Sequence, residues 1–188
     1  TSDIHMKYKL NMTKEQVLEH AIRAVEYAKK HGLQVEFSAE DATRSDRDFL
    51  IRVFKSVEEV GADRIDIPDT VGYATPEYIA SLVKEVDHNT SLPISMHCHD
   101  DFGQAVANSL AGINSGANCA HVTINGIGER AGNASLEEFV MSLHCLYNKK
   151  TNIQTQLLYE TSKFVSNTMG IIVQPNKAII GENAFGQE

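Results

Sequence analysis

The regular alternation of strand-like and helix-like segments restricts the fold more than any other feature of the sequence. Short apolar segments predict strands over residues 33–41, 63–70, 92–99 and 118–125. Each is followed by a segment of helical periodicity, over residues 45–61, 75–86, 103–116 and 135–147. A further amphipathic helix is predicted over residues 12–32. Strict alternation of this kind produces a parallel sheet covered by helices.

The ends of the predicted helices carry recognisable signals. Thr13 and Gln16 have the spacing of a capping box at the start of the first predicted helix. Gly32 supplies the left-handed residue that ends the same helix. Thr75 followed by Pro76 places a capping side chain before proline at the first helical position. These boundaries support the division into strand–helix units.

Two architectures share the pattern, the eight-stranded (β/α)8 TIM barrel and the open doubly wound sheet. The polar clusters "SAED", "IPDT", "HCHDD" and "INGIGERAGN" each follow a predicted strand. Polar residues delivered by four successive strands favour a barrel, because an open sheet concentrates its site at one switch point. With two weaker strands, "SDIHM" and "GIIVQ", we expect five to six βα units. Residues 1–188 are therefore interpreted as part of a TIM-barrel catalytic domain that lacks its first strand or strands and the C-terminal regions.

Composition excludes several classes of partner. Lys plus Arg total 17 against 25 for Asp plus Glu, so the formal net charge is −8 and no basic run could follow a nucleic-acid backbone. No apolar run approaches the roughly 20 residues needed to span a bilayer. The three cysteines form no CxxC pair and no disulfide framework. We expect a cytoplasmic protein that binds neither nucleic acid nor membranes.

The stretch "SMHCHDDFG" contains two histidines that share one face of a strand. Side chains alternate along a strand, so His97 and His99 point the same way while Met96 and Cys98 point the other way. Two imidazoles on one face can bind a divalent cation, but an HxH pair can equally be polar or structural. The two aspartates that follow also suit a turn and a helix cap.

The stretch "TINGIGERAGNASLEE" has glycines at 126, 128 and 132. Their spacing differs from that of a dinucleotide-binding loop, and Glu129 would lie where an anionic pyrophosphate is expected. A tight turn from strand to helix explains the glycines without a ligand, and a cap on the next helix is an alternative explanation for Asn133.

These motifs together resemble those of the DRE-TIM metallolyases. "HCHDDFGQAVANSL" followed by "TINGIGERAGNASLEE" is similar to the paired signature of the 2-isopropylmalate, citramalate and homocitrate synthases, and "EFSAEDATRSD" and "IPDTVGYATP" match the same synthases in the same order. The resemblance covers nearly the whole chain. It implies that His97 and His99 bind the catalytic divalent cation (Mg²⁺, Mn²⁺ or Zn²⁺), with Asn133 as a further ligand.

The resemblance also implies roles for four other residues. Glu40 matches the catalytic glutamate, and Thr70 matches a threonine that holds the carboxylate of a 2-oxo acid. Glu129 and Arg130 match positions that orient the loop. The implied enzyme is an acyltransferase that condenses acetyl-CoA with the 2-oxo acid to a 2-hydroxy dicarboxylate, and a homodimer is expected for the full-length protein.

Within this family, 2-isopropylmalate synthase of leucine biosynthesis is the preferred reading. Citramalate synthase, homocitrate synthase, a lyase on the same scaffold and a noncatalytic module are the alternatives. The motif on the first barrel strand, with its aspartate ligand, does not occur here, and Gln187 stands where a histidine is common. We therefore expect the segment alone to be inactive.

Overall fold

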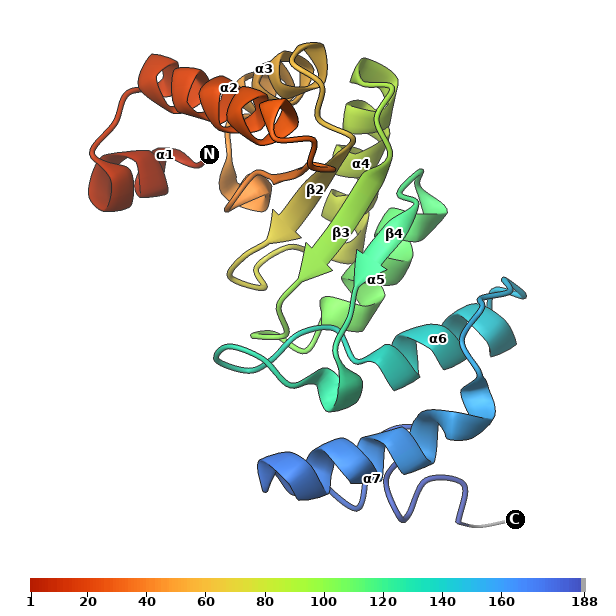
Figure 1. Cartoon of the computed structure of the whole chain (residues 1–188). Helices are drawn as coiled ribbons and strands as arrows, with labels where there is room; N and C mark the ends of the chain where they lie inside the picture. The colour runs from red at the N-terminus through yellow and green to blue at the C-terminus, as the bar shows by residue number, and fades with distance from the viewer. Residues whose placement is uncertain (187–188) are drawn as a thin grey trace. The chain divides into compact units, whose positions relative to one another are not determined.

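The computed structural model describes residues 1–186, so Gln187 lies outside the described residues. The chain forms two compact units, residues 1–121, here the sheet unit, and residues from 122 onward, here the helical unit (Figure 1). Each unit is described by itself. None of the helices in the described part of the chain combines the length and apolar character needed to cross a membrane.

The sheet unit contains all the strands found among the described residues. Its elements are α1 (Asp3–His5), η1 (Met6–Leu10), α2 (Lys14–Lys30), β1 (Glu36–Ser38), η2 (Ala42–Arg44), α3 (Arg47–Glu59), β2 (Arg64–Asp69), α4 (Pro76–Asn89), β3 (Ile94–Cys98), α5 (Ala105–Asn114) and β4 (Cys119–His121). The helical unit contains η3 (Ile124–Gly126), α6 (Leu136–Cys145), η4 (Thr155–Leu157) and α7 (Leu158–Met169).

The four strands form one parallel sheet in the order β1-β2-β3-β4. Each strand pairs with the next one along the chain, and each is followed by a helix, as the alternating pattern predicted. The register aligns Ser38, Asp66, Ser95 and Cys119 across the sheet. Aligned residues of parallel strands point to the same side, so this row lies on one face.

The two faces of the sheet differ in chemistry. Ile65, Ile67, Ile94 and Met96 point to the face covered by helices, and all four are fully buried. Leu82 of α4 is likewise fully buried in this layer. The opposite face carries polar side chains, which is the arrangement expected for the interior of a barrel that holds a site.

One helix lies very close to its strand. A methyl group on Gly112 of α5 would come within 2.5 Å of the Met96 Cγ atom on β3. Since Met96 is fully buried, it has little room to move away. The backbone of α5 therefore packs directly on the Met96 side chain of the strand that carries the two histidines.

Local signals explain where the helices begin and end. The Thr13–Gln16 capping box is present at the start of α2, and the Thr75 hydroxyl accepts a hydrogen bond from the Tyr78 amide at the start of α4. Gly32 adopts a φ of 73°, which a residue with a side chain adopts at a cost. The predicted boundaries of these helices are confirmed within a few residues.

Two predicted strands are wrong. "SDIHM" forms α1 and the start of η1, because the Ser2 hydroxyl accepts the His5 amide and caps a helical turn. "GIIVQ" is irregular, and no strand of the described chain lies beside it to supply a ladder. The described residues therefore contain four βα units instead of the five to six expected.

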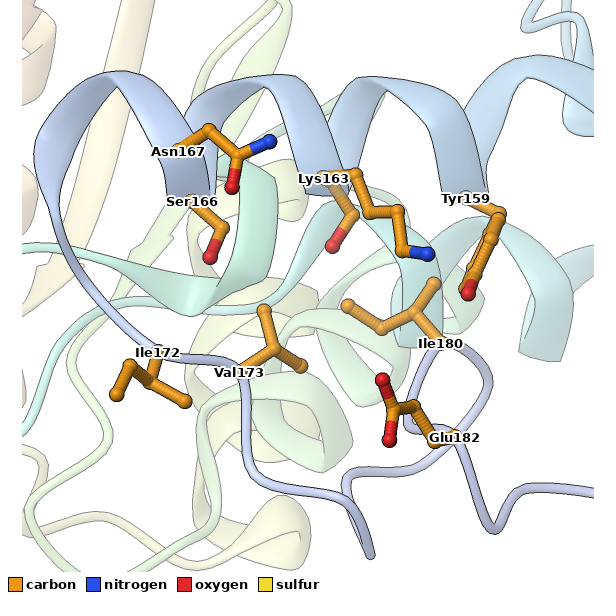
Figure 2. A pocket seen from close by; sticks show the side chains of 9 residues that line it. Tyr159, Lys163, Ser166, Asn167, Ile172, Val173, Ile180 and Glu182 are labelled. Atoms are coloured by element: carbon orange, nitrogen blue, oxygen red, sulfur yellow. The ribbon is translucent and has the colours of Figure 1, made fainter.

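The helical unit contains a helix that the sequence pattern had not predicted. α7 buries Leu158 and Ser162 and ends at Gly170, which has a φ of 67°. A cavity of about 330 Å³ lies between this helix and the segment after it, and Figure 2 shows the side chains that line it. Lys163 and Glu182 line it together with both polar and apolar side chains, and none of the residues predicted to act in catalysis is among them.

Candidate metal and substrate site

The predicted site residues of the sheet unit lie where its strands end. Glu40 follows β1, Thr70 follows β2, and His97 and His99 lie on and just after β3. The Thr70 hydroxyl accepts a hydrogen bond of 2.8 Å from the amide of Asp41, the residue after Glu40. The structure thus brings the ends of β1 and β2 together at the carboxyl edge of the sheet, where parallel-sheet enzymes place their sites.

The two histidines point at one another. Their Nε2 atoms are 3.3 Å apart, and their ring centroids are 5.1 Å apart. Ligand atoms around a tetrahedral ion with bonds of about 2.1 Å are separated by roughly 3.4 Å. The spacing of the two nitrogens therefore fits two ligands of one cation, and His97 and His99 share a face as predicted.

The protonation state of His97 also suits metal binding. Burial, assisted by the neighbouring rings of His99 and His121, lowers the pKa of His97 from 6.5 to about 4. At neutral pH the imidazole is therefore uncharged, the form that coordinates a metal. His99 is 8% exposed.

Glu40 is accessible at the rim of the sheet. Its side chain is 48% exposed, and it forms an ion pair with Lys9. The Nδ1 atom of His5 lies 3.7 Å from the same carboxylate oxygen. A half-exposed carboxylate in this position is accessible to a bound substrate.

The neighbouring Asp41 was not singled out from the sequence. It is fully buried with a left-handed φ of 63°, and Arg44 donates to its carboxylate from Nε and from a terminal nitrogen, each at 2.9 Å. Burial acts to raise the pKa of Asp41, but hydrogen bonds from Arg44 and Ser2 prevail and lower it. Asp41 holds the loop that presents Glu40, and the i, i+3 spacing with Arg44 was the available signal.

A second buried aspartate organises the loop after β2. The Asp69 carboxylate accepts hydrogen bonds from the Thr43 hydroxyl at 2.8 Å, from the Asn108 side chain at 3.2 Å and from the Ala74 amide. Gly72 allows this loop to approach the next one, because a Cβ there would lie 2.8 Å from the His99 carbonyl oxygen. The strand ends that carry Thr70 and His99 are therefore packed against each other.

Asn133, Glu129 and Arg130 belong to the helical unit. The loop between β4 and α6 is tight: the Asn133 amide donates to the Gly126 carbonyl at 3.0 Å, and a Cβ on Gly128 would overlap the Asn133 side chain. Asn133 is 9% exposed, and Arg130 lies 3.5 Å from the Glu129 carboxylate. That Asn133 joins the two histidines, and that Glu129 and Arg130 orient the loop, stay predictions.

The polar face of the sheet carries further residues that sequence reasoning missed. Glu36, Asp66 and His121 come from three different strands and place their ligand atoms within 4.8 Å of one another. Burial raises the pKa of Asp66 to about 6, although a hydrogen bond from Ser38 and the nearby His121 act in the opposite direction. Strand alternation places these residues on the face of His97, but their meeting depends on the register.

The sequence is similar to curated synthases over its whole length. It is 56% identical to a probable 2-isopropylmalate synthase of Methanopyrus kandleri, 57% identical to an (R)-citramalate synthase of Methanocaldococcus jannaschii and 58% identical to a 2-isopropylmalate synthase of Sulfurisphaera tokodaii. All of this chain is covered in each case, but only 38%, 38% and 49% of those proteins. The chain thus spans less than half the length of these relatives.

Solved structures support the fold. A hydroxymethylglutaryl-CoA lyase of Pseudomonas aeruginosa matches with a TM-score of 0.78 at 19% identity, over 92% of this chain and 61% of that chain. The HMG-CoA lyase of Bacillus subtilis matches with a TM-score of 0.75 at 23% identity, over 90% and 61%. The four-stranded sheet is therefore part of a TIM barrel, as the sequence predicted. Since the profile of the HMGL-like family matches residues 1–165, the chain belongs to the HMGL-like family.

Proposed function

We propose that this chain carries part of the active site of an acyltransferase that joins the acetyl group of acetyl-CoA to the keto carbon of a 2-oxo acid, as a 2-isopropylmalate synthase does. The observation that carries the proposal is the 3.3 Å approach of the His97 and His99 Nε2 atoms at the strand ends. The identity of 56–58% to proteins named as such synthases supports it.

The position of each residue determines the role that we propose for it. His97 and His99, with Asn133 as the proposed third ligand, would hold a divalent cation, which supplies a Lewis acid for the ketone of the 2-oxo acid. Glu40 would take the proton from the methyl group of acetyl-CoA, because its carboxylate is accessible at the same rim. Thr70, whose oxygen is fixed by the Asp41 amide, would position the carboxylate of the 2-oxo acid.

A citramalate synthase is the second candidate, because a relative of that name is 57% identical. The two reactions differ in the side chain of the 2-oxo acid, which is isopropyl in one and methyl in the other. The homodimer and the cytoplasmic location expected from the sequence belong to the same proposal.

The test is an assay of the full-length protein with acetyl-CoA, a divalent cation and a series of 2-oxo acids, in which released CoA is measured with a thiol reagent. We expect the highest kcat/KM with the isopropyl substrate and loss of turnover in His97→Ala. Preference for the methyl substrate would establish the second candidate. Absence of CoA release with every 2-oxo acid, together with cleavage of a 3-hydroxyacyl-CoA, would replace the synthase by a lyase.

A further inference from the structure

A second group of ligand-type side chains lies on the polar face of the sheet. Glu36 of β1, Asp66 of β2 and His121 of β4 offer two carboxylates and one imidazole. A Glu36 oxygen lies 3.3 Å from the His121 Nε2 atom, and the Asp66 Oδ1 atom lies 3.9 Å from the His121 Nδ1 atom. An imidazole gives one nitrogen to an ion, so the relevant set is one atom from each residue. These atoms lie within 4.8 Å of one another, against roughly 3.4 Å between ligands of a tetrahedral ion.

Asp66 is held in one orientation, and one of its oxygens lacks a partner. The Ser38 hydroxyl donates to Oδ2 at 2.6 Å, as the outer-shell partner of a metal-binding carboxylate does. Asp66 is 2% exposed, and within residues 1–186 its Oδ1 atom has no hydrogen-bond partner. A buried oxygen left without a partner destabilises the fold, so a cation there would offset that penalty.

The two carboxylates of the group are set back from the histidine pair along the strands, whereas His121 is in register with His97. Asp66 is in register with Ser95, two residues before His97, which corresponds to about 6.6 Å along a strand. The His97 and His121 rings are neighbours, with centroids 5.5 Å apart. Two cations can therefore occupy this face only if the two rings bind different ions. His121 would bind one ion with the carboxylates, and His97 would bind the other with His99.

We propose that Glu36, Asp66 and His121 form a second divalent-cation site, separate from the His97–His99 pair. One imidazole and two carboxylates suit Zn²⁺ or Mn²⁺ better than Mg²⁺, which prefers oxygen ligands and retains its water. The site joins β1, β2 and β4, so its cation fixes the spacing of the strands beneath the rim. Its role is structural, since none of its three ligands lies at a strand end that carries Glu40 or Thr70.

The same contacts could be made without a metal if a protonated His121 bridged the two carboxylates. Metal binding distinguishes the two arrangements, because an imidazolium does not coordinate. The decisive substitution is Glu36→Gln, which keeps the size of a side chain that is 34% exposed and removes one ligand charge. His121→Gln removes the imidazole from the same group.

The experiment is a calorimetric titration of the purified 188-residue chain with Zn²⁺, repeated with Mn²⁺ and Mg²⁺. We expect two Zn²⁺ sites in the unaltered chain. Glu36→Gln and His121→Gln should each lower the Zn²⁺ affinity of the Glu36–Asp66–His121 site by at least about 10-fold. His99→Ala should lower the Zn²⁺ affinity of the His97–His99 site and leave that of the Glu36–Asp66–His121 site unchanged. Glu59→Gln, which removes a carboxylate from the exposed surface of α3, is the matched control.

Two results would overturn the proposal. The first is an unchanged number and affinity of Zn²⁺ sites in Glu36→Gln and His121→Gln, with far-ultraviolet circular dichroism showing both variants folded. The second is a single Zn²⁺ that both His99→Ala and Glu36→Gln abolish, which would mean one shared cation. Neither result bears on the synthase assay, which depends on the histidine pair.

Discussion

The sheet unit and the helical unit bury their apolar side chains to very different extents. Most buried apolar residues of the described chain belong to the sheet unit, whereas most of its large exposed apolar side chains belong to the shorter helical unit. Phe164 of α7 is 70% exposed, while Leu82 of α4 is fully buried. Side-chain caps follow this division only in part: α2, α3 and α4 have them, whereas α5 of the sheet unit lacks one at its N-cap residue, as do α6 and α7. His97 and His99 are thus held by the unit that buries most of the apolar side chains.

Catalysis should depend on the sheet unit far more than on exposed carboxylates of the helical unit. Glu40→Gln in the full-length protein keeps the size of the side chain and removes its basicity, so we expect kcat to fall by about 100- to 10,000-fold. Glu160→Gln on α7 is the matched control and should leave kcat unchanged. Steady-state kinetics measures both, and Zn²⁺ affinity should be the same in the two variants. Similar kcat values for them would remove Glu40 from the chemistry.

The difference in packing can be measured as stability. Leu82→Ala leaves a cavity in the sheet unit and should lower the free energy of unfolding by about 2–5 kcal/mol. Phe164→Ala truncates an exposed ring, and the expected change is within about 0.5 kcal/mol. Urea unfolding of the 188-residue chain followed by circular dichroism gives both values. A large loss in Phe164→Ala would show that α7 is covered in solution, for example by association of the chain with itself.

The smallest expected effect concerns the helix caps. Thr75→Ala removes the hydroxyl that accepts the Tyr78 amide and should cost about 1 kcal/mol. Leu157 lies just before α7, but it is the last residue of η4 and has φ −93° and ψ −7°, whereas a residue that caps a helix is extended. Leu157→Asp should therefore change the free energy of unfolding by no more than about 0.5 kcal/mol. Thermal unfolding reports both changes. A stabilisation by Leu157→Asp as large as the loss in Thr75→Ala would show that position 157 can cap α7.

Helices were predictable where several local signals agreed. The Thr13 capping box, the Thr75–Pro76 pair and Gly32 each fix a boundary through contacts within a few residues of the chain. Strands at the ends of the pattern were not predictable in this way. "SDIHM" and "GIIVQ" have strand-like composition, but a strand exists only if another strand lies beside it, and that depends on distant parts of the chain.

The candidate site also has features that local sequence predicts and features that depend on distant parts of the chain. The shared face of His97 and His99 follows from strand alternation, so it was predictable from two residues alone. The meeting of Glu36, Asp66 and His121 depends on the register of four strands, which no local pattern contains. Asp41 and Asp69 were missed because their importance lies in burial and in partners that only the folded chain reveals.

The contact between Gly112 and Met96 has a consequence for how this protein can change over generations. A larger residue at position 112 must displace the buried side chain of Met96, which belongs to β3, the strand that carries His97 and His99. Selection that preserves the two imidazoles therefore also preserves a glycine codon on the opposite face of the sheet. A lineage that replaced Gly112 would need a smaller side chain at Met96 at the same time, so these two positions should change together or not at all.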